Sequence, residues 1–251
     1  MSSIFVTISR KLNNFTSYIQ PFSDSERLVR RVLLIRAHPV PDSFSAALAD
    51  ATERGLRSAG HDIRVRSLYL HPNTKLKSYG GATFPPAMTT EERRGYMDPV
   101  LIEERQSGNL KLSEELVEAV NDIKWCDSVV FVFPTWWFSL PAILKGFLDR
   151  VLLPGVAFRL PDPSLKGAGG TGLVSGLTNI KKLGAVTTYG TPWYVVLYCG
   201  DSSRSILSNG VRPICAPDCP MVWNALYNMN DSTQSQRDKF LETVEKNYSK
   251  F

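Results

Sequence analysis

The run Ser128–Phe133 constrains the fold more than any other feature of the chain, because five of its six side chains are apolar. An apolar run without alternation predicts a strand that is buried on both faces, as in the middle of a parallel sheet. Val32–Ile35 and Leu183–Thr188 have a similar character, and further strands are expected at Ile63–Leu68 and Met221–Tyr227. The chain therefore carries the strands of a largely buried sheet.

Helical patterns separate these strands. The expected helices are Ala46–Ala59, Leu112–Lys124, Ala142–Leu152 and Thr233–Tyr248. The first follows a helix-capping serine, Ser43, and the third follows a proline that is typical of helix starts. Because parallel strands are joined by crossover helices of one hand, this order of elements predicts a doubly wound α/β domain.

The rest of the chain divides into an extension and one domain. Residues 1–29 are rich in Ser and Thr and precede the first strand, so we expect an N-terminal extension followed by a single domain over residues 30–251. Residues 69–110 form a long excursion between two strands, with a short helix that starts at Thr89–Glu92. Excursions of this length are usually functional or bind a partner.

Composition excludes several classes of protein. With 43% hydrophobic and 21% charged residues the chain can build a core, and no apolar run approaches the roughly 20 residues of a membrane span. The net charge of +5 comes from interleaved charges, which argues against nucleic acid and suits an anionic small ligand. Four cysteines do not make a disulfide scaffold, so we expect a cytoplasmic location, with the extension as a candidate organellar targeting segment.

Ligands of open parallel sheets bind beyond the carboxyl ends of the strands, so the loops there form the candidate site. The first of them runs from His38 to Ser45 and enters a helix, whose free N–H groups and dipole favour an anion. His38, Ser43 and Ser45 add side-chain donors. Two interpretations stay open: an anion site, or a plain helix cap at Ser43 beside a turn histidine.

The second and third loops supply flat and polar surfaces. Trp136-Trp137-Phe138 follows the strongest strand, and three consecutive aromatics cannot share one helix face, so at least one is expected to meet a flat partner such as an isoalloxazine ring. Burial in the core is the alternative. The third loop begins at Thr187-Thr188-Tyr189-Gly190, where hydroxyls and amides can bond a heteroaromatic edge and Gly190 permits a close approach or a positive φ.

Three other features are predicted to carry no chemistry. Gly167–Gly172 has the spacing of a dinucleotide-binding fingerprint but follows no apolar strand, so we expect a flexible loop. Cys215 and Cys219 have no histidine nearby and lack the spacing of zinc ligands, so we expect no metal. Asp149 and Arg150 are expected to form surface or subunit ion pairs.

Taken together, the motifs resemble the flavodoxin-like NAD(P)H:quinone oxidoreductases, the family of the mammalian DT-diaphorases and of many bacterial NAD(P)H-dependent oxidoreductases. The resemblance is carried by His38-Pro39, Ser43-Phe44, Phe133–Phe138, Leu140–Ala142, Leu144–Gly146 and Thr187–Gly190, and Pro154–Phe158 is closest to the bacterial branch. It implies a five-stranded parallel sheet of order 2-1-3-4-5, a tightly bound FAD, with FMN as the alternative, and a homodimer whose active sites lie at the subunit interface.

The resemblance also implies a role for each loop. The flavin phosphates and adjoining chain would be held by His38, Ser43, Phe44 and Ser45. The isoalloxazine would be lined by Pro134, Thr135, Trp136, Trp137 and Phe138, and its polar edge would be met by Thr187, Thr188, Tyr189 and Gly190. Trp137, Phe138 and Tyr194 would shape the substrate slot as the expected catalytic residues. Tyr194 lies one residue out of step with a tyrosine of the mammalian enzymes, and the histidine that follows it there has no counterpart here.

The implied activity is a two-electron reduction by a ping-pong mechanism, in which NAD(P)H delivers hydride and leaves before a quinone or another flat acceptor binds. One alternative is an electron carrier or regulatory flavoprotein on the same fold, without turnover of a small substrate. Such carriers are usually small and acidic, unlike this chain. Another alternative is a scaffold that binds a partner protein through residues 1–31 and 69–110.

Overall fold

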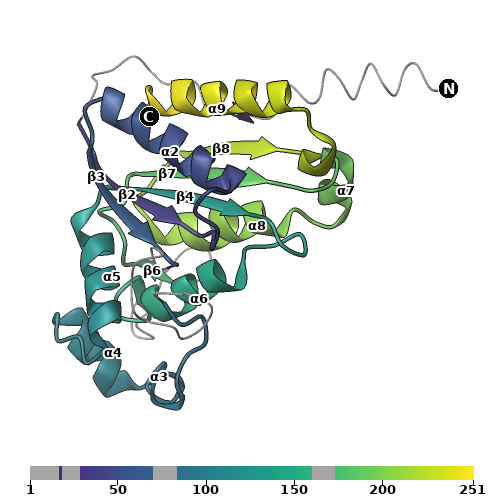
Figure 1. Cartoon of the computed structure of the whole chain (residues 1–251). Helices are drawn as coiled ribbons and strands as arrows, with labels where there is room; N and C mark the ends of the chain where they lie inside the picture. Colours follow the sequence, from purple (N-terminus) through teal and green to yellow (C-terminus); the bar gives the residue numbers. More distant parts are fainter. Residues whose placement is uncertain (1–16, 19–28, 70–83, 160–172) are drawn as a thin grey trace.

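The computed structural model describes residues 17–18, 29–69, 84–159 and 173–251. Its centre is a six-stranded sheet of order β1-β8-β7-β4-β2-β3 (Figure 1). The parallel strands are β3 (Asp62–Ser67), β2 (Arg31–Arg36), β4 (Ser128–Pro134), β7 (Lys182–Thr188) and β8 (Met221–Leu226). Numbered among themselves along the chain, they follow the order 2-1-3-4-5, which confirms the expected doubly wound fold.

The middle of the sheet is formed by β4 and β7, in which every residue is buried. Their register pairs Phe133 with Thr187 and Pro134 with Thr188, so the two strands end at the same edge of the sheet. At one side of the sheet, β3 presents Arg64 and Arg66, and charged side chains of this kind discourage pairing with a foreign strand.

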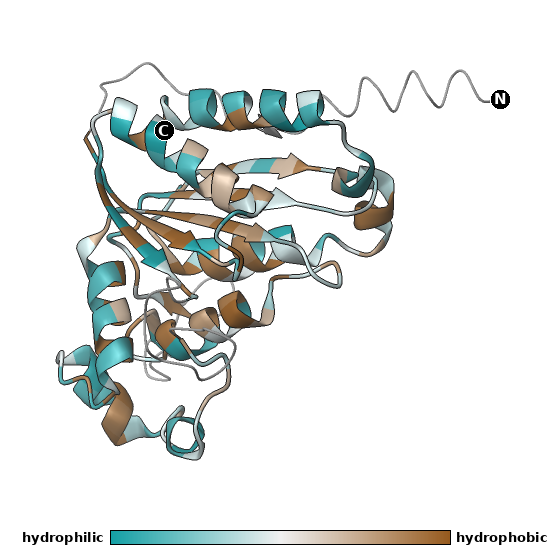
Figure 2. Ribbon diagram, viewed as in Figure 1, coloured by the Kyte–Doolittle hydropathy of each residue, from teal (hydrophilic) through white to brown (hydrophobic). Residues whose placement is uncertain are grey.

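Helices cover both faces of the sheet (Figure 1). On one face, α2 (Phe44–Ser58) and α9 (Gln234–Tyr248) pack on the apolar cluster that includes Val130 and Val186. On the other face lie α5 (Glu114–Trp125) and α6 (Ala142–Val151). Figure 2 shows apolar residues concentrated on the strands, whereas most of α9 is hydrophilic, consistent with its position at the surface.

The predicted helices begin within two residues of their expected starts, with α2 at Phe44 rather than Ala46 and α5 at Glu114 rather than Leu112. The Ser43 hydroxyl accepts a hydrogen bond from the N–H of Ala46 at 3.1 Å and caps α2. Thr233 forms a capping box with Gln236 at the start of α9. Thr89 does the same with Glu92 at the start of α3 (Thr90–Arg94). Because a cap needs only residues three positions apart, it can be read from the sequence alone.

The long excursion is held to the domain by a buried ion pair. Arg150, on α6, is 3% exposed, and its guanidinium donates to the Glu92 carboxylate at 2.6 and 3.0 Å and to the carbonyl of Pro85 at 2.7 Å. The expectation that Arg150 belongs to a surface or subunit pair is therefore wrong, because Pro85 and Glu92 pack against α6 and remove the guanidinium from water. A second helix of the excursion, α4 (Pro99–Gln106), was not predicted.

Several short elements carry no sequence signal that we recognised. They are β1 (Ser17–Tyr18), β5 (Phe158–Arg159), β6 (Val174–Ser175), α7 (Trp193–Tyr198), α8 (Ser202–Ser205), a π-helix at Ile206–Val211, and 3-10 helices at Arg212–Ile214 and Met229–Asp231. β1 belongs to the N-terminal extension and pairs antiparallel with β8, so part of the extension joins the sheet. The predicted loop Gly167–Gly172 lies outside the described residues.

Candidate functional site

The three predicted loops meet at the carboxyl edge of the sheet, after β2, β4 and β7 (Figure 1). The rings of His38, in the first loop, and Trp136, in the second, lie 6.3 Å apart between centroids. The second and third loops are joined by Thr135, whose N–H and hydroxyl both donate to the Thr188 carbonyl. The fold thus assembles in one place residues that are up to about 150 positions apart, as the position of ligand sites in open α/β sheets leads one to expect.

The first loop presents unpaired donors at the start of α2. The N–H of Ala46 is capped by Ser43, and the N–H of Ala47 donates to the Ser43 carbonyl, but the N–H groups of Phe44 and Ser45 have no acceptor among the described residues. The N–H of Val40 donates to His38 Nδ1 at 3.1 Å and fixes the imidazole. The helix dipole adds partial positive charge, so an anion is favoured here.

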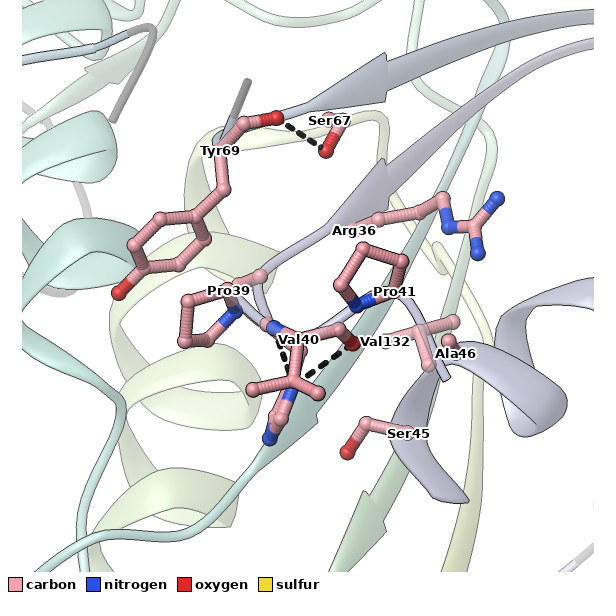
Figure 3. Close-up of a pocket in the computed structure, with 11 residues that line it drawn as sticks. Arg36, Pro39, Val40, Pro41, Ser45, Ala46, Ser67, Tyr69 and Val132 are labelled. Carbon is pink, nitrogen blue, oxygen red and sulfur yellow. Dashed lines mark hydrogen bonds between the residues drawn. The ribbon is translucent and has the colours of Figure 1, made fainter. Parts of the chain in front are cut away.

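A narrow pocket of about 60 Å³ continues from this helix start toward β3. It is lined by Arg36, His38, Ser45, Ser67 and Tyr69, among others. Figure 3 shows Tyr69 on one side of the Pro39–Pro41 loop and Ser45 on the other. The Ser67 hydroxyl donates to the Tyr69 carbonyl at 2.8 Å. Burial raises the pKa of Tyr69, so its phenol is a hydrogen-bond donor at neutral pH.

The second loop is a tight turn with an unusual backbone. The peptide groups of Trp136 and Ser139 bond to each other in both directions at 3.1 Å, which closes a two-residue hairpin turn. The two central residues, Trp137 and Phe138, have φ of 51° and 58°, the left-handed region that glycine and asparagine normally occupy. Non-glycine residues in this conformation are strained and concentrate at functional sites.

The strained turn displays an aromatic ring and free donors. Trp137 is 95% exposed, so burial in the core, the alternative left open by the sequence, does not apply to this residue. The N–H groups of Trp137 and Phe138 have no acceptor within the described part of the chain. A flat ligand could therefore find both a ring to stack on and hydrogen-bond donors at its edge.

The third loop closes the opposite side of a cleft of about 240 Å³, which is lined by Thr135, Trp137, Phe138, Tyr189, Gly190 and Thr191. Gly190 does not have the positive φ that was one of its two predicted uses. Instead, its lack of a side chain lets Asn230 approach closely, because a β-carbon at Gly190 would lie 3.0 Å from Nδ2 of Asn230. Thr191 lies in the predicted third loop but was not among the predicted site residues, because a lone threonine between glycine and proline carries no signal of its own.

The predicted residues divide by position. Thr135, Trp137, Phe138, Tyr189 and Gly190 line the cleft, and His38 and Ser45 line the narrow pocket. Pro134, Thr187 and Thr188 are buried strand ends behind the cleft, Ser43 and Phe44 start α2, and Tyr194 is exposed on α7. The side chain of Tyr189 is buried and its ring is stacked on that of Tyr227.

The chemistry of this donor set fits a flavin. Unpaired N–H groups at a helix start suit a phosphate, and an exposed indole beside unpaired N–H groups suits a ring with apolar faces and an electron-rich edge. Among the described residues no group of histidine, cysteine, aspartate and glutamate side chains is arranged to hold a metal ion. In the same part of the chain, no helix is long and apolar enough to span a bilayer.

Comparison with known proteins agrees with this geometry. The family model described as "Flavodoxin-like fold" matches residues 30–201. Ribosyldihydronicotinamide dehydrogenase (quinone) of Homo sapiens is 32% identical over 168 residues, which are 64% of this chain and 64% of that protein. Ribosyldihydronicotinamide dehydrogenase-like protein traD of Penicillium crustosum is 33% identical over 149 residues, 58% of this chain and 54% of that protein. The chain thus spans between about half and two thirds of the length of these relatives.

A solved structure gives the same result for the fold. The NAD(P)H:quinone oxidoreductase from Methanothermobacter marburgensis superposes with a TM-score of 0.66, covering 88% of this chain and 96% of that one. The two sequences are 23% identical over this superposition. At this level of identity the similarity concerns the architecture of the chain.

Proposed function

The chain belongs to the flavodoxin-like fold family, and on that premise we propose that it is a flavin-dependent two-electron reductase, which passes hydride from NAD(P)H to quinones or similar flat acceptors. The name of the human relative, a ribosyldihydronicotinamide dehydrogenase (quinone), supports this activity for the part of the chain that the two proteins share.

The observation that carries the proposal is the cleft between the strained turn and the third loop. Its exposed Trp137 ring and the unpaired N–H groups of Trp137 and Phe138 face a volume of about 240 Å³ at the carboxyl edge of β4 and β7. A second set of unpaired N–H groups, at Phe44 and Ser45, starts α2 nearby. The two sets match the two ends of a flavin, its ring and its phosphate.

A bound flavin would supply the hydride chemistry, and the chain would hold and orient it. The N–H groups of Phe44 and Ser45, with the hydroxyls of Ser43 and Ser45 and the ring of His38, would bind the phosphate. Pro134, Thr135 and Trp136 would form the wall behind the ring, and the N–H groups of Trp137 and Phe138 would donate to it. Gly190 would meet the polar edge through its backbone, supported from behind by Tyr189, Thr187 and Thr188.

We infer FAD as the cofactor, with FMN as the alternative. The narrow pocket leads away from the start of α2 to Tyr69. It is lined by Arg36, whose guanidinium pairs with Asp50 at 3.0 Å, and by Ser45 and Ser67. Such a path suits the second phosphate and ribose of a dinucleotide, which FMN lacks.

The substrate slot would be shaped by Trp137, Phe138 and Tyr194. Their rings would stack on the nicotinamide and on the acceptor and keep water from the transferred hydride. Because one slot serves both substrates, NAD(P)H would have to leave before the acceptor enters, which is a ping-pong order.

We also infer a homodimer and a cytoplasmic location. The exposed rings of Trp137 and Tyr194 support the first inference, because a second subunit would cover them as the other wall of the slot. The four free cysteines support the second, because free thiols persist in a reducing compartment.

The test is to purify the full chain, release its cofactor by denaturation and identify it by chromatography, and then follow NADH and NADPH oxidation with menadione. We expect FAD at one equivalent per chain and parallel lines in double-reciprocal plots. Flavin without turnover would support the electron-carrier alternative instead. Absence of flavin after reconstitution with both FAD and FMN would exclude the proposed function.

A further inference from the structure

Tyr189 lies in the lining of the cleft, yet its side chain points into the protein. It is 1% exposed, and its hydroxyl donates to Oδ1 of Asp201 at 2.6 Å. Its ring is stacked on that of Tyr227, with centroids 4.9 Å apart and planes 10° apart. The residue therefore forms part of the wall of the cleft while its side chain is fixed in the interior.

Asp201 is at a helix N-cap position, but its side chain does not cap the helix. It occupies the N-cap of α8, where an aspartate usually accepts a hydrogen bond from the helix N–H groups. No such bond is formed, and the carboxylate accepts the Tyr189 hydroxyl instead. The backbone of Asp201 has a φ of 41°, in the left-handed region. A strained residue that gives up its local bond for a distant one indicates that the distant bond matters.

The Tyr189–Asp201 bond joins two segments that border the site. The peptide of Tyr189 is fixed to the β8 side, because its N–H donates to Leu226 at 2.8 Å and its carbonyl accepts from Met229 at 2.9 Å. Asp201 ends the segment that carries α7, and its N–H donates to the carbonyl of Val196 at 3.0 Å. Displacement of either residue would move Gly190 and α7 relative to each other.

We propose that Asp201 is a positioning residue that acts through the Tyr189 hydroxyl to hold α7, with Tyr194, at a fixed distance from the Gly190 edge of the cleft. The inference rests on the proposed function, for which it supplies a determinant of acceptor binding. A short hydrogen bond to a carboxylate is among the stronger kinds. Burial, followed by the nearby Asp201 charge, raises the pKa of Tyr189, so the phenol remains a donor over the whole physiological range.

The test uses three substitutions in the full chain. Tyr189→Phe removes the donor and keeps the ring, Asp201→Ala removes the acceptor, and Asp201→Asn keeps an acceptor oxygen. We expect the first two to raise KM for menadione about tenfold with kcat nearly unchanged. An effect of this size corresponds to the loss of one hydrogen bond to a charged group. Asp201→Asn should restore most of the affinity. The double variant Tyr189→Phe/Asp201→Ala should have a KM for menadione no higher than that of the single variant with the higher KM.

Two control variants separate this role from general damage. Asp218→Ala makes the same change at an exposed aspartate that also has a left-handed backbone, φ 57°, so it carries a similar backbone cost without the bond. Tyr198→Phe likewise removes a tyrosine hydroxyl, at a residue that is 91% exposed. Both controls should keep the wild-type KM. If Asp218→Ala raises KM as much as Asp201→Ala does, the positioning role is overturned.

A second measurement does not depend on flavin or activity. Amide hydrogen exchange over residues 190–200 should be faster in Tyr189→Phe and Asp201→Ala than in the wild type and both controls. Unchanged exchange, or unchanged KM in an active enzyme, would overturn the proposal. If the wild-type protein binds no flavin, the proposed function fails while the exchange result still decides whether the bond fixes this segment. If Asp201→Ala does not fold, Tyr189→Phe carries both measurements.

Discussion

The N–H and the hydroxyl of Thr135 both donate to the carbonyl oxygen of Thr188, at 2.9 and 2.7 Å. One carbonyl at the end of β7 thus holds the start of the aromatic loop that follows β4. These two hydrogen bonds, rather than contacts between exposed side chains, fix the two walls of the cleft to each other.

Thr135→Val should weaken the joint between the two loops. The substitution keeps the shape of the side chain but removes one of the two donors, so we expect the free energy of unfolding to fall by about 1 kcal/mol and flavin affinity to fall with it. Thr52→Val is the matched control, because the hydroxyl of the buried Thr52 likewise donates to a backbone carbonyl, that of Leu48, at 2.7 Å on α2. Urea unfolding and flavin titration measure both effects. Equal loss of flavin affinity in the two variants would contradict the prediction.

Trp137→Gly and Trp137→Ala should differ from each other in stability but should impair acceptor binding to the same extent. Both remove a ring that is almost fully exposed, so little packing is lost. Glycine adopts the φ of 51° without strain, whereas alanine does not, so Trp137→Gly should be more stable than Trp137→Ala by about 1 kcal/mol. Both variants should raise KM for menadione. Thermal unfolding of the two apoproteins compares the stabilities, and equal stabilities would argue against strain in the turn.

Glu92 should contribute to stability at neutral pH and lose that contribution in acid. Burial alone raises its pKa, but the hydrogen bonds from Arg150 and from the Thr89 N–H, with the Arg150 charge, bring the pKa below its usual value. A carboxyl whose folded pKa is lowered stabilises the protein above its unfolded pKa, about 4.3, and loses this as pH falls through the folded pKa.

The variant Glu92→Gln should therefore be less stable than the wild type at pH 7 by about 2 kcal/mol, a difference that shrinks below about pH 4. Glu91→Gln, at the exposed neighbouring position, should follow the wild-type curve. Urea unfolding between about pH 3 and pH 7 tests this linkage. A difference that is independent of pH would contradict it.

Lys182 should make stability rise with pH. Its side chain is buried near the ring of Phe251, and burial, followed by the charge of Arg30, lowers its pKa to about 7. Lysine in the unfolded chain titrates near 10.4, so between about pH 7 and pH 10 the unfolded chain binds more protons at this residue than the folded protein does. In that window each rise in pH favours the folded state.

The variant Lys182→Met removes the pH-dependent contribution of Lys182 to the free energy of unfolding. Relative to the variant, the wild type should gain stability between about pH 6.5 and pH 9.5, and the difference isolates the lysine from cysteines and tyrosines that titrate in the same range. Lys181→Met, at the exposed neighbouring position, is the control. A constant difference between wild type and Lys182→Met over this window would show that the ammonium is not desolvated.

Much of the site was predictable because its signals are local. The aromatic run after β4, the serine cap of α2 and the threonines at the end of β7 lie at strand ends, and the geometry of parallel sheets brings strand ends together. The left-handed backbone of Trp137 and Phe138 was not predictable, because neither residue type favours it. Only closure of the Trp136–Ser139 turn over the strand end imposes that conformation.

The sequence by itself determined the order of strands and helices, the helix caps and the loops that form the site. These follow from apolar periodicity and from contacts between residues a few positions apart, which do not depend on the rest of the fold. Tertiary structure decided that Arg150 is buried, that Tyr189 turns its side chain away from the cleft, and that Asp201 bonds to it. Those outcomes depend on which distant segments exclude water from a side chain, and no local pattern encodes that choice.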